Sequence, residues 1–387
     1  MTGGFAAIPP LASAVTLTVA IPARNEEASI GPALRALAQQ RQRDGAPFAY
    51  TRYDVIVFAN DCEDATVARA REVAGAHTGF ALHVVAGALP PRDAHVGTAR
   101  KAVMDVAARR FFEAGRPRGT VATTDADTIV DAGWIAETVA EASEADAVMG
   151  RILLAPGDRE RLSAQMRRLY LRDMAYRRVV AELEALRDPV ACDPLPRHGQ
   201  HYGASFAVSA GAYARAGGVP PRPVLEDLAF FQALQRIDAR VRHSTRVRVA
   251  TSARTLARVE GGFATFLRDL HACAERRDEP LVEPAGLTLA RIDARAALRR
   301  LWRGVALPED LARVTATYAL SRDRFQRLFE RSEAFGANAE RLEACASHTF
   351  AGVPPEPTTV ALAALRCALV ASKAARPTRA IAASGAG

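Results

Sequence analysis

Asp125 and Asp127, one residue apart in the segment TTDADT, are the strongest chemical signal in the sequence. They follow an apolar run that is predicted as a strand, and ligands of open parallel sheets bind just outside the carboxyl ends of strands. Two carboxylates so close together are most simply stabilised by a hard cation such as Mg²⁺ or Mn²⁺, which takes one or two carboxylates plus substrate phosphates. The alternative is a solvated turn in which Asp127 caps the next helix.

Two further segments place polar groups after predicted strands. In IPARNEEASI, Asn25 or Glu26 can fold back on a strand–turn–helix junction, whose backbone N–H groups could hold a nucleotide. The alternative is a capped helix whose acidic residues favour the N-terminal dipole. In NDCEDAT, Asn60 could contact a base or a ribose, whereas Asp64 and Thr66 are typical helix caps.

Two segments place charged residues near predicted helix starts. In AHVGTARK, Gly97 permits a close approach of the backbone, and Arg100 or Lys101 could face a diphosphate. The alternative for either cation is a position on the helix surface. Glu226 and Asp227 begin a helix after a Gly/Pro-rich loop, where a carboxylate could act as a general base or merely favour the helix dipole.

Three histidines are weaker candidates. His198 and His201 lie in a loop before an apolar run and could help to bind an acceptor. As a metal pair they have no third ligand nearby in the sequence. His243 lies on a later predicted strand, where a solvated or hydrogen-bonded histidine is the alternative to a metal ligand.

Apolar runs alternate with amphipathic stretches in the first half of the chain, which predicts an α/β fold with a mostly parallel sheet. The predicted strands are Val15–Ile21, Asp54–Ala59, His83–Val85, Gly119–Thr124, Ala147–Leu154, Gly203–Val208 and an edge strand at Val241–Val249. The predicted helices are Ala28–Gln40, Val67–Ala74, Gly97–Ala114, Arg159–Leu186 and Glu226–Ile237, and the first strand is expected to stop at Pro22. This alternation would bring the polar segments to one edge of the sheet.

The pattern changes after Gly261-Gly262, because Phe263–Leu342 is helical in spacing without strand alternation. We expect an α/β domain over residues 1–260, a helical C-terminal region over 261–375 and a disordered tail over 376–387. The helical region carries no interpretable motif. It would either cover an acceptor cleft or make a homodimer contact.

Composition narrows the classes of partner. The chain has 387 residues and a formal net charge of +8, but lysine occurs only at Lys101 and Lys373, and no basic block is interleaved with aromatics. We therefore expect no nucleic-acid partner, although the basic excess could attract an anionic substrate. The five cysteines are far apart without a C-x-x-C pair, and no secretory leader or transmembrane segment is evident. A cytoplasmic location is the expectation.

The order of these segments, together with GASFAVSAGAYARAGGVP before LEDLAF, resembles the family-2 glycosyltransferases of GT-A fold. The resemblance runs from about Val15 to about Val249. It implies a Rossmann-like domain, over residues 1–260 of this chain, that binds a nucleoside-diphosphate sugar together with a divalent cation, Mg²⁺ or Mn²⁺. It further implies transfer of the sugar to a small-molecule or glycan acceptor.

The resemblance also assigns roles to individual residues. Pro22, Arg24, Asn25 and Glu26 stand where the first loop contacts the nucleoside, Asn60 stands where an acid usually reads the base, and Gly203, Ala204 and Ser205 stand beneath the acceptor side. Asp125 and Asp127 match the metal and diphosphate motif, with Asp127 the better candidate for direct ligation, and Arg100 or Lys101 could add positive charge at the leaving group. Asp227, with Glu226 beside it, matches the catalytic base of inverting enzymes, and His243 stands where some relatives have another metal ligand. The base is left open between uridine and guanosine, because Ala59 and Asn60 depart from the family pattern.

The absence of a Q-x-x-R-W motif favours single addition over processive synthesis. Two alternatives stay open. A nucleotidyltransferase would normally carry a Gly-rich basic loop after the first strand, whereas IPARNEEASI is acidic. A non-catalytic sugar-binding relative of the same fold is the second. A dinucleotide-dependent oxidoreductase is disfavoured because no G-x-G-x-x-G follows a strand.

Overall fold

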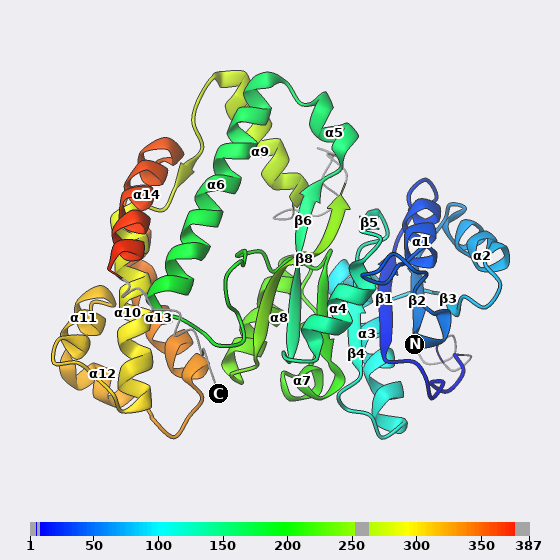
Figure 1. The fold of residues 1–387 in the computed structure, drawn as a ribbon, viewed down its shortest axis with the longest axis horizontal. Coiled ribbons are helices and arrows are strands. Elements are labelled where there is room, and N and C mark those ends of the chain that lie inside the picture. Colours follow the sequence, from blue (N-terminus) through cyan, green and yellow to red (C-terminus); the bar gives the residue numbers. More distant parts are fainter. Residues whose placement is uncertain (1–4, 6–7, 252–262, 376–387) are drawn as a thin grey trace, which may run out of the picture.

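The computed structural model describes residue 5, residues 8–251 and residues 263–375 (Figure 1). The expected boundary at Gly261-Gly262 and the expected tail over 376–387 lie outside these residues. In the described part of the chain, an eight-stranded sheet lies beside a group of C-terminal helices, as Figure 1 shows.

The sheet has the strand order β3-β2-β1-β4-β7-β6-β8-β5. The strands are β1 Leu17–Ala23, β2 Tyr53–Asn60, β3 Leu82–Gly87, β4 Thr120–Thr123, β5 Thr128–Val130, β6 Ala147–Leu154, β7 Phe206–Ser209 and β8 Val241–Thr251. The pairs β3-β2, β2-β1, β1-β4 and β6-β8 are parallel, while β7 and β5 pair antiparallel with their neighbours. The expectation of a mostly parallel α/β sheet is therefore confirmed.

Two strand predictions were wrong in detail. β1 does not stop at Pro22 but runs on to Ala23, since β4 has ended opposite Ala20 and proline is tolerated where one side of a strand has no partner. The strand predicted as Val241–Val249 is not an edge, because β5 pairs outside it. β5 has three residues directly after the DADT segment, too few to produce an alternating pattern.

Five of the helices that cover the sheet or follow it lie close to the predicted ones, whereas the helix Trp134–Ala142 was not predicted. The helices are α1 Ile30–Ala38, α2 Thr66–Ala76, α3 Val96–Glu113, α4 Trp134–Ala142, α5 Pro156–Arg161, α6 Ala164–Arg187, α7 Ala210–Arg215 and α8 Glu226–Arg236. The helix expected over 159–186 is divided in two, because Leu162 is extended and the hydroxyl of Ser163 caps α6 by accepting from the N–H of Met166.

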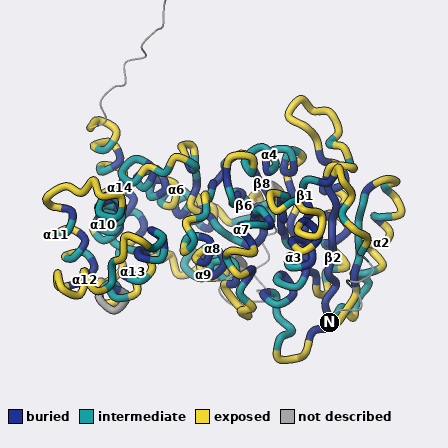
Figure 2. Tube along the Cα trace, turned by 90° about the horizontal axis from the view of Figure 1, so that it is seen from below, coloured by how far each residue is buried: buried dark blue, intermediate teal, exposed yellow. Residues whose placement is uncertain are grey.

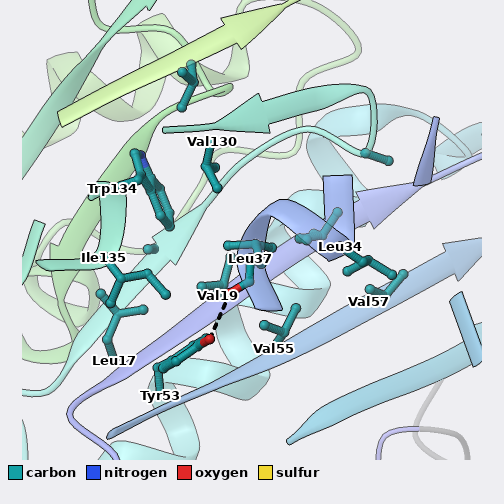
Figure 3. Close-up of a cluster of buried hydrophobic side chains, with 14 of the residues drawn as sticks. Leu17, Val19, Leu34, Leu37, Tyr53, Val55, Val57, Val130, Trp134 and Ile135 are labelled. Carbon is teal, nitrogen blue, oxygen red and sulfur yellow. Dashed lines mark hydrogen bonds between the residues drawn. The ribbon is translucent and has the colours of Figure 1, made fainter. Parts of the chain in front are cut away.

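The strands bury both faces, as alternating side chains of a covered sheet must. Leu17, Val19 and Ile21 pack on one face with α1 and α4, as Figure 3 shows for Leu34, Leu37 and Trp134. The hydroxyl of Tyr53 donates to the carbonyl of Leu37 at 2.7 Å. Ala20 and Ile56 pack on the other face against α3. The tube view shows the strands as the most buried part of the chain (Figure 2).

Besides the contact of Leu267 and Leu270 with Leu154 and Leu169, two other places join the C-terminal helices to the α/β domain. These helices are α9 Phe263–Arg276, α10 Ala285–Arg303, α11 Asp310–Thr317, α12 Arg322–Leu328, α13 Phe335–Ala351 and α14 Thr358–Ala374, with a two-stranded ladder of β9 Leu281–Val282 and β10 Glu356–Pro357. At the first place, Val179 and Leu183 of α6 are buried against α10 and α14. At the second, the carboxylate of Asp238, just after α8, accepts from the N–H groups of Phe335 and Gly336 at 2.6 and 2.8 Å.

Glycine is required at the second place. A Cβ on Gly336 would overlap with the carbonyl oxygen of Gln235, so α13 begins in direct contact with the end of α8. The ion pair between Arg236 and Glu340, at 2.6 Å, lies beside this contact. No helix in the part of the chain that the structure describes is long and apolar enough to cross a membrane.

The buried ion pair of Asp54 and Arg110 yields a test of stability. Asp54 lies on β2 and Arg110 on α3, their atoms are 2.7 Å apart, and the hydroxyl of Thr18 donates to Asp54 at 2.6 Å. Burial alone would raise the pKa of Asp54, but bonds to His83, Arg110 and Thr18 reverse this, so the pKa is lowered. Its contribution to stability is therefore present above pH ~4 and is lost as the pH falls through the lowered pKa.

Asp54→Asn should lower the free energy of unfolding at pH 7 by about 3–5 kcal/mol, since it leaves Arg110 buried without its counter-charge. It should also weaken the acid dependence of stability, and urea unfolding at several pH values measures both effects. Glu72→Gln, which breaks an exposed pair with Arg69, is the control and should change stability by less than about 0.5 kcal/mol. An equally small effect at Asp54 would contradict the assignment.

Candidate functional site

The carboxyl ends of β2, β1 and β4 lie side by side at one edge of the sheet. Each is followed by one of the polar segments that the sequence singled out. The N-terminal parts of α3 and α8 reach the same edge, because Arg100 on α3 contacts both Asp125 after β4 and Glu226 at the start of α8. Parallel pairing therefore assembles a polar site from five separate segments.

The loops after β1 and β2 are fastened to each other. Asn25 has a left-handed backbone (φ 53°), and its side-chain oxygen accepts from the N–H of Glu63 at 2.9 Å. The N–H of Glu26 donates to Thr66 Oγ1 at 2.7 Å. Glu27 donates its N–H to the carboxylate of Asp64, at 3.0 Å. Asp64 and Thr66 are not the N-cap of α2, which is Ala65 without a side-chain cap bond, but they fix the shape of the first loop.

Arg24 and Asn60 hold neighbouring segments. The guanidinium of Arg24 donates to the carbonyl of Ala94 at 3.1 Å. Asn60 is buried, and its side-chain oxygen accepts from the N–H of Leu89 at 3.1 Å, which ties β2 to the loop after β3. Asp61 follows with a left-handed backbone (φ 49°) and is less buried. Sequence reasoning passed over Asp61, although an acid after a strand end was the available signal.

Arg100 is the centre of the site, although it is a charged residue only 4% exposed. Its guanidinium donates to Glu226 Oε1 at 3.1 Å and to Asp125 Oδ1 at 2.7 Å. It also donates to Thr123 Oγ1 at 2.9 Å and to the carbonyl of Gly203 at 3.1 Å. Burial alone would lower the pKa of Arg100, but the charges of Asp125 and Glu226 raise it above the ordinary value.

The two acidic residues at the start of α8 differ in their surroundings. Glu226 is 5% exposed, and burial raises the pKa of its carboxyl, an effect that the charge of Arg100 partly opposes. Asp227 is less buried and accepts from the N–H of Gly203 at 2.9 Å and from that of Leu228 at 2.7 Å. Leu225, which precedes both residues at the start of α8, has a left-handed backbone (φ 55°).

Several predicted binding residues contact other residues of the chain. A Cβ on Gly97 would overlap with the carbonyl oxygen of Arg222, so this glycine allows α3 to pack on the loop before α8. Lys101 pairs with Asp105 on its own helix at 3.0 Å. Ser205 is buried and accepts from the indole N–H of Trp134 at 2.9 Å. The contacts of these three residues are therefore with neighbours other than Asp125, Glu226 and Asp227.

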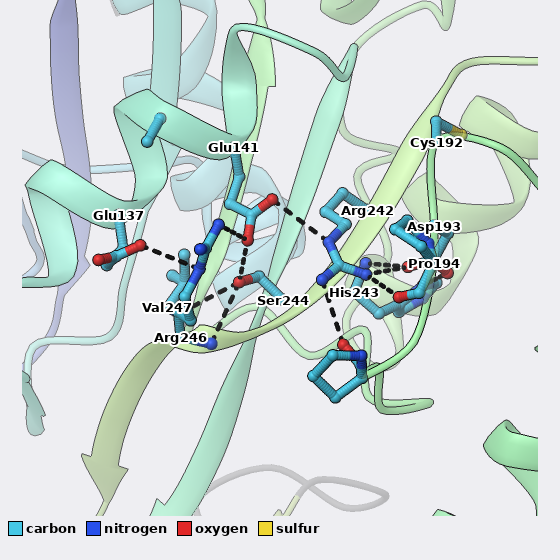
Figure 4. Close-up of polar contacts among 12 residues, drawn as sticks. Glu137, Glu141, Cys192, Asp193, Pro194, Arg242, His243, Ser244, Arg246 and Val247 are labelled. Atoms are coloured by element: carbon cyan, nitrogen blue, oxygen red, sulfur yellow. Dashed lines mark hydrogen bonds and ion pairs between the residues drawn. The ribbon is translucent and has the colours of Figure 1, made fainter. Parts of the chain in front are cut away.

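His243 is also separate from the aspartate pair. Its Nδ1 lies 2.8 Å from Asp193 Oδ2, in the polar cluster with Arg242 that Figure 4 shows. In the sheet, His243 lies opposite Met149, then Phe206, then Thr123. Three strand spacings, about 14 Å, thus separate it from the end of β4. The expectation that His243 joins Asp125 and Asp127 is not met in this arrangement.

The other two histidines are packed against neighbours. His198 Nδ1 accepts from the N–H of Gln200 at 3.0 Å, and its Nε2 lies 3.1 Å from the carbonyl of Ser244. Burial lowers the pKa of His198 to about 3, so it is neutral at pH 7. The ring of His201 stacks on Phe231 of α8, with centroids 4.6 Å apart, and burial lowers its pKa as well.

Comparison with solved structures gives likenesses of low sequence identity. TarS residues 1–349 of S. aureus, in complex with UDP, is 15% identical with a TM-score of 0.43, covering 88% of this chain and 92% of that one. Mannosyltransferase PcManGT from Pyrobaculum calidifontis, in complex with GDP-Man and Mn²⁺, is 17% identical with a TM-score of 0.42, covering 95% and 89%. Glucosyl-3-phosphoglycerate synthase of Mycobacterium tuberculosis is 17% identical with a TM-score of 0.35, covering 68% and 78%.

Comparison of sequences gives a family. No curated protein matches the chain. A family model, described as glycosyl transferase family 2, matches residues 18–192, which run from β1 to the loop after α6 and include the first loop, Arg100 and the aspartate pair. The mostly parallel sheet with flanking helices agrees with the GT-A fold that the sequence resemblance implied. Residues 18–192 of this chain therefore match glycosyl transferase family 2, the family that the sequence resemblance named.

Proposed function

We propose that the protein transfers a sugar from a nucleoside-diphosphate sugar to a hydroxyl of a small-molecule or glycan acceptor, with inversion, one sugar at a time, and with a divalent cation. The observation that carries the proposal is the charge balance of the site. Asp125 and Glu226 contact the guanidinium of Arg100, Asp227 is adjacent to Glu226, and Asp127 follows two residues after Asp125. This excess of carboxylate favours a cation at the edge of the sheet where a diphosphate would lie.

The residues present fit Mg²⁺ or Mn²⁺ if the donor contributes oxygens. Arg100 occupies Oδ1 of Asp125, whose side chain is 36% exposed, and a carboxylate has further acceptor positions. No three His, Cys, Asp or Glu side chains among the described residues are grouped as a ready-made metal site. Asp125 and Asp127 would therefore hold the cation jointly with the diphosphate. When bound, the cation would stabilise negative charge on the leaving diphosphate.

The chain's own groups account for the other steps. Asp227 would accept the proton of the acceptor hydroxyl as that oxygen attacks the sugar, and its hydrogen bonds to the N–H groups of Gly203 and Leu228 hold the carboxylate in one orientation. The joined loops after β1 and β2 would bind the nucleoside, with Pro22, Arg24, Asn25 and Glu26 on one and Asn60 followed by Asp61 on the other.

The proposal also covers the limits of the catalytic domain, the role of the helical region and the location of the protein. We place the catalytic domain within residues 1–260 and assign acceptor covering or a homodimer contact to the helical region over 261–375. A cytoplasmic location is part of the same hypothesis. The buried contacts of α6 with α10 and α14 mean that a chain cut before the helical region would expose Val179 and Leu183.

A donor panel tests the reaction class. UDP-, GDP-, ADP- and dTDP-sugars are each added with and without Mn²⁺, and thermal unfolding and donor hydrolysis are both followed. A donor at a hundredfold excess over its Kd stabilises the native protein by about 2.7 kcal/mol. Hydrolysis or transfer supports the enzyme, whereas stabilisation without turnover would favour a non-catalytic sugar-binding protein. Release of pyrophosphate from a nucleoside triphosphate would favour a nucleotidyltransferase.

Asp127→Asn should weaken donor binding in the presence of Mn²⁺ much more than in its absence, because the amide removes one negative charge from the cation site. Calorimetry with the donor identified by the panel measures both affinities. Glu144→Gln, at an exposed position on the same chain, is the control and should bind like the parent. Equal donor affinity of Asp127→Asn with Mn²⁺, or full activity of the parent in excess chelator, would contradict the metal assignment.

Asp227→Asn should show the opposite pattern. Donor affinity should stay near that of the parent, while turnover falls by about 10²–10⁴, since an amide cannot accept the acceptor's proton. The two measurements are donor calorimetry and product formation with any accepted substrate. Loss of donor binding together with turnover would show that Asp227 organises the site, and the base would then have to be sought elsewhere.

A further inference from the structure

We propose that Arg100 is a positioning residue: its buried guanidinium sets the position of Asp125 relative to α8, the helix that carries Asp227, and Glu226 is its counter-ion rather than a base. The inference rests on the proposed function, because it concerns how the same carboxylates are held. It differs from the expectation that Arg100 faces a diphosphate. The geometry assigns Arg100 to the interior of the site, beneath the groups that would meet substrate.

The first argument is the set of segments that Arg100 connects. Through hydrogen bonds to described residues it joins the end of β4, at Thr123 and Asp125, to the start of α8, at Glu226. It also holds the carbonyl of Gly203, whose N–H donates to Asp227. A short chain of hydrogen bonds thus runs from the guanidinium to the proposed base.

The second argument is the shape of the guanidinium group of Arg100. The bonds leave Nε, Nη1 and Nη2 in different directions, a planar fork that an ammonium group cannot reproduce. A Cβ on Gly203 would lie 2.8 Å from Arg100 Cζ, so glycine is needed here to leave room for the guanidinium. Arg100 and Gly203, which are far apart in the sequence, therefore fit each other in one contact.

The third argument concerns Glu226. A buried carboxyl at an active site is often a base. Glu226, however, is 5% exposed and directs Oε1 to Arg100, while Asp227 beside it is less buried. Asp227 has the exposure that a base for an outside hydroxyl needs, and Glu226 supplies the charge that keeps Arg100 in place.

The experiment compares Arg100→Lys with Arg110→Lys. Both arginines lie on α3, both side chains are 5% exposed, and each pairs with a buried carboxylate, Arg110 with Asp54 away from the site. Both variants should lose thermal stability. Measured per folded enzyme below both unfolding temperatures, kcat should fall by roughly 10²-fold in Arg100→Lys, the size expected for misplaced groups, and should stay near the parental value in Arg110→Lys.

A second comparison avoids any change in the arginine. Gly203→Ala should reduce kcat as Arg100→Lys does, whereas Gly199→Ala, in the same loop with open space around it, should not. Glu226→Gln keeps an oxygen for Arg100 Nε, so it should lower kcat less than Asp227→Asn does. Its fall to the level of Asp227→Asn would make Glu226 the base.

The outcomes separate this inference from the proposed function. If Asp227→Asn loses turnover but Arg100→Lys keeps the kcat of Arg110→Lys, the positioning role is wrong and the function stands. If Asp227→Asn keeps parental turnover, the proposed function fails first. A fall in kcat for Arg100→Lys and Gly203→Ala, without one in their controls, supports the inference.

Discussion

A guanidinium that is buried at the edge of the sheet needs carboxylates close to it. Arg100 has one of them in Glu226, which lies 126 residues further along the chain. A buried charge without partners is costly, so the ion pairs of Arg100 require α3, the end of β4 and the start of α8 to meet in one geometry. The glycines at 97 and 203 fit the same requirement, because each removes a Cβ where two segments come into contact. The packing of these segments within the protein therefore sets the geometry of the site.

Much of the fold could be predicted from the sequence. The strands Asp54–Ala59 and Ala147–Leu154 are mostly apolar, interrupted only by Asp54 at the start of one and by Gly150 and Arg151 within the other, and such runs favour strands covered on both faces. The short strand β5 could not be predicted, because its three residues have no pattern of their own and are held by pairing with β8. Because β5 was not predicted, β8 was expected at the edge of the sheet, although β5 pairs outside it.

The site was predicted in part. Asp125 and Glu226 do meet through Arg100, and Asn25 and Glu26 do lie in a loop fixed at the sheet edge. What the sequence could not show is the direction in which each side chain lies. Arg100 and Lys101 are adjacent, yet the first is buried among carboxylates while the second pairs with Asp105 on the helix surface. Neighbouring residues on a helix diverge, and only the packing of α3 decides which of them is inside.

The contact between Gly336 and Gln235 matters to anyone who wishes to exchange parts of this protein. α8 has eleven residues and is therefore about 16 Å long. Asp227 lies in its first turn, and Asp238 lies just after its last turn. The first turn of α8 is anchored by Arg100, and its last turn rests on the start of α13. A chimaera that takes its helical region from another protein must bring a glycine and two N–H groups to this turn. Without them, the transplant removes a support of the last turn of α8, one helix length from Glu226 and Asp227.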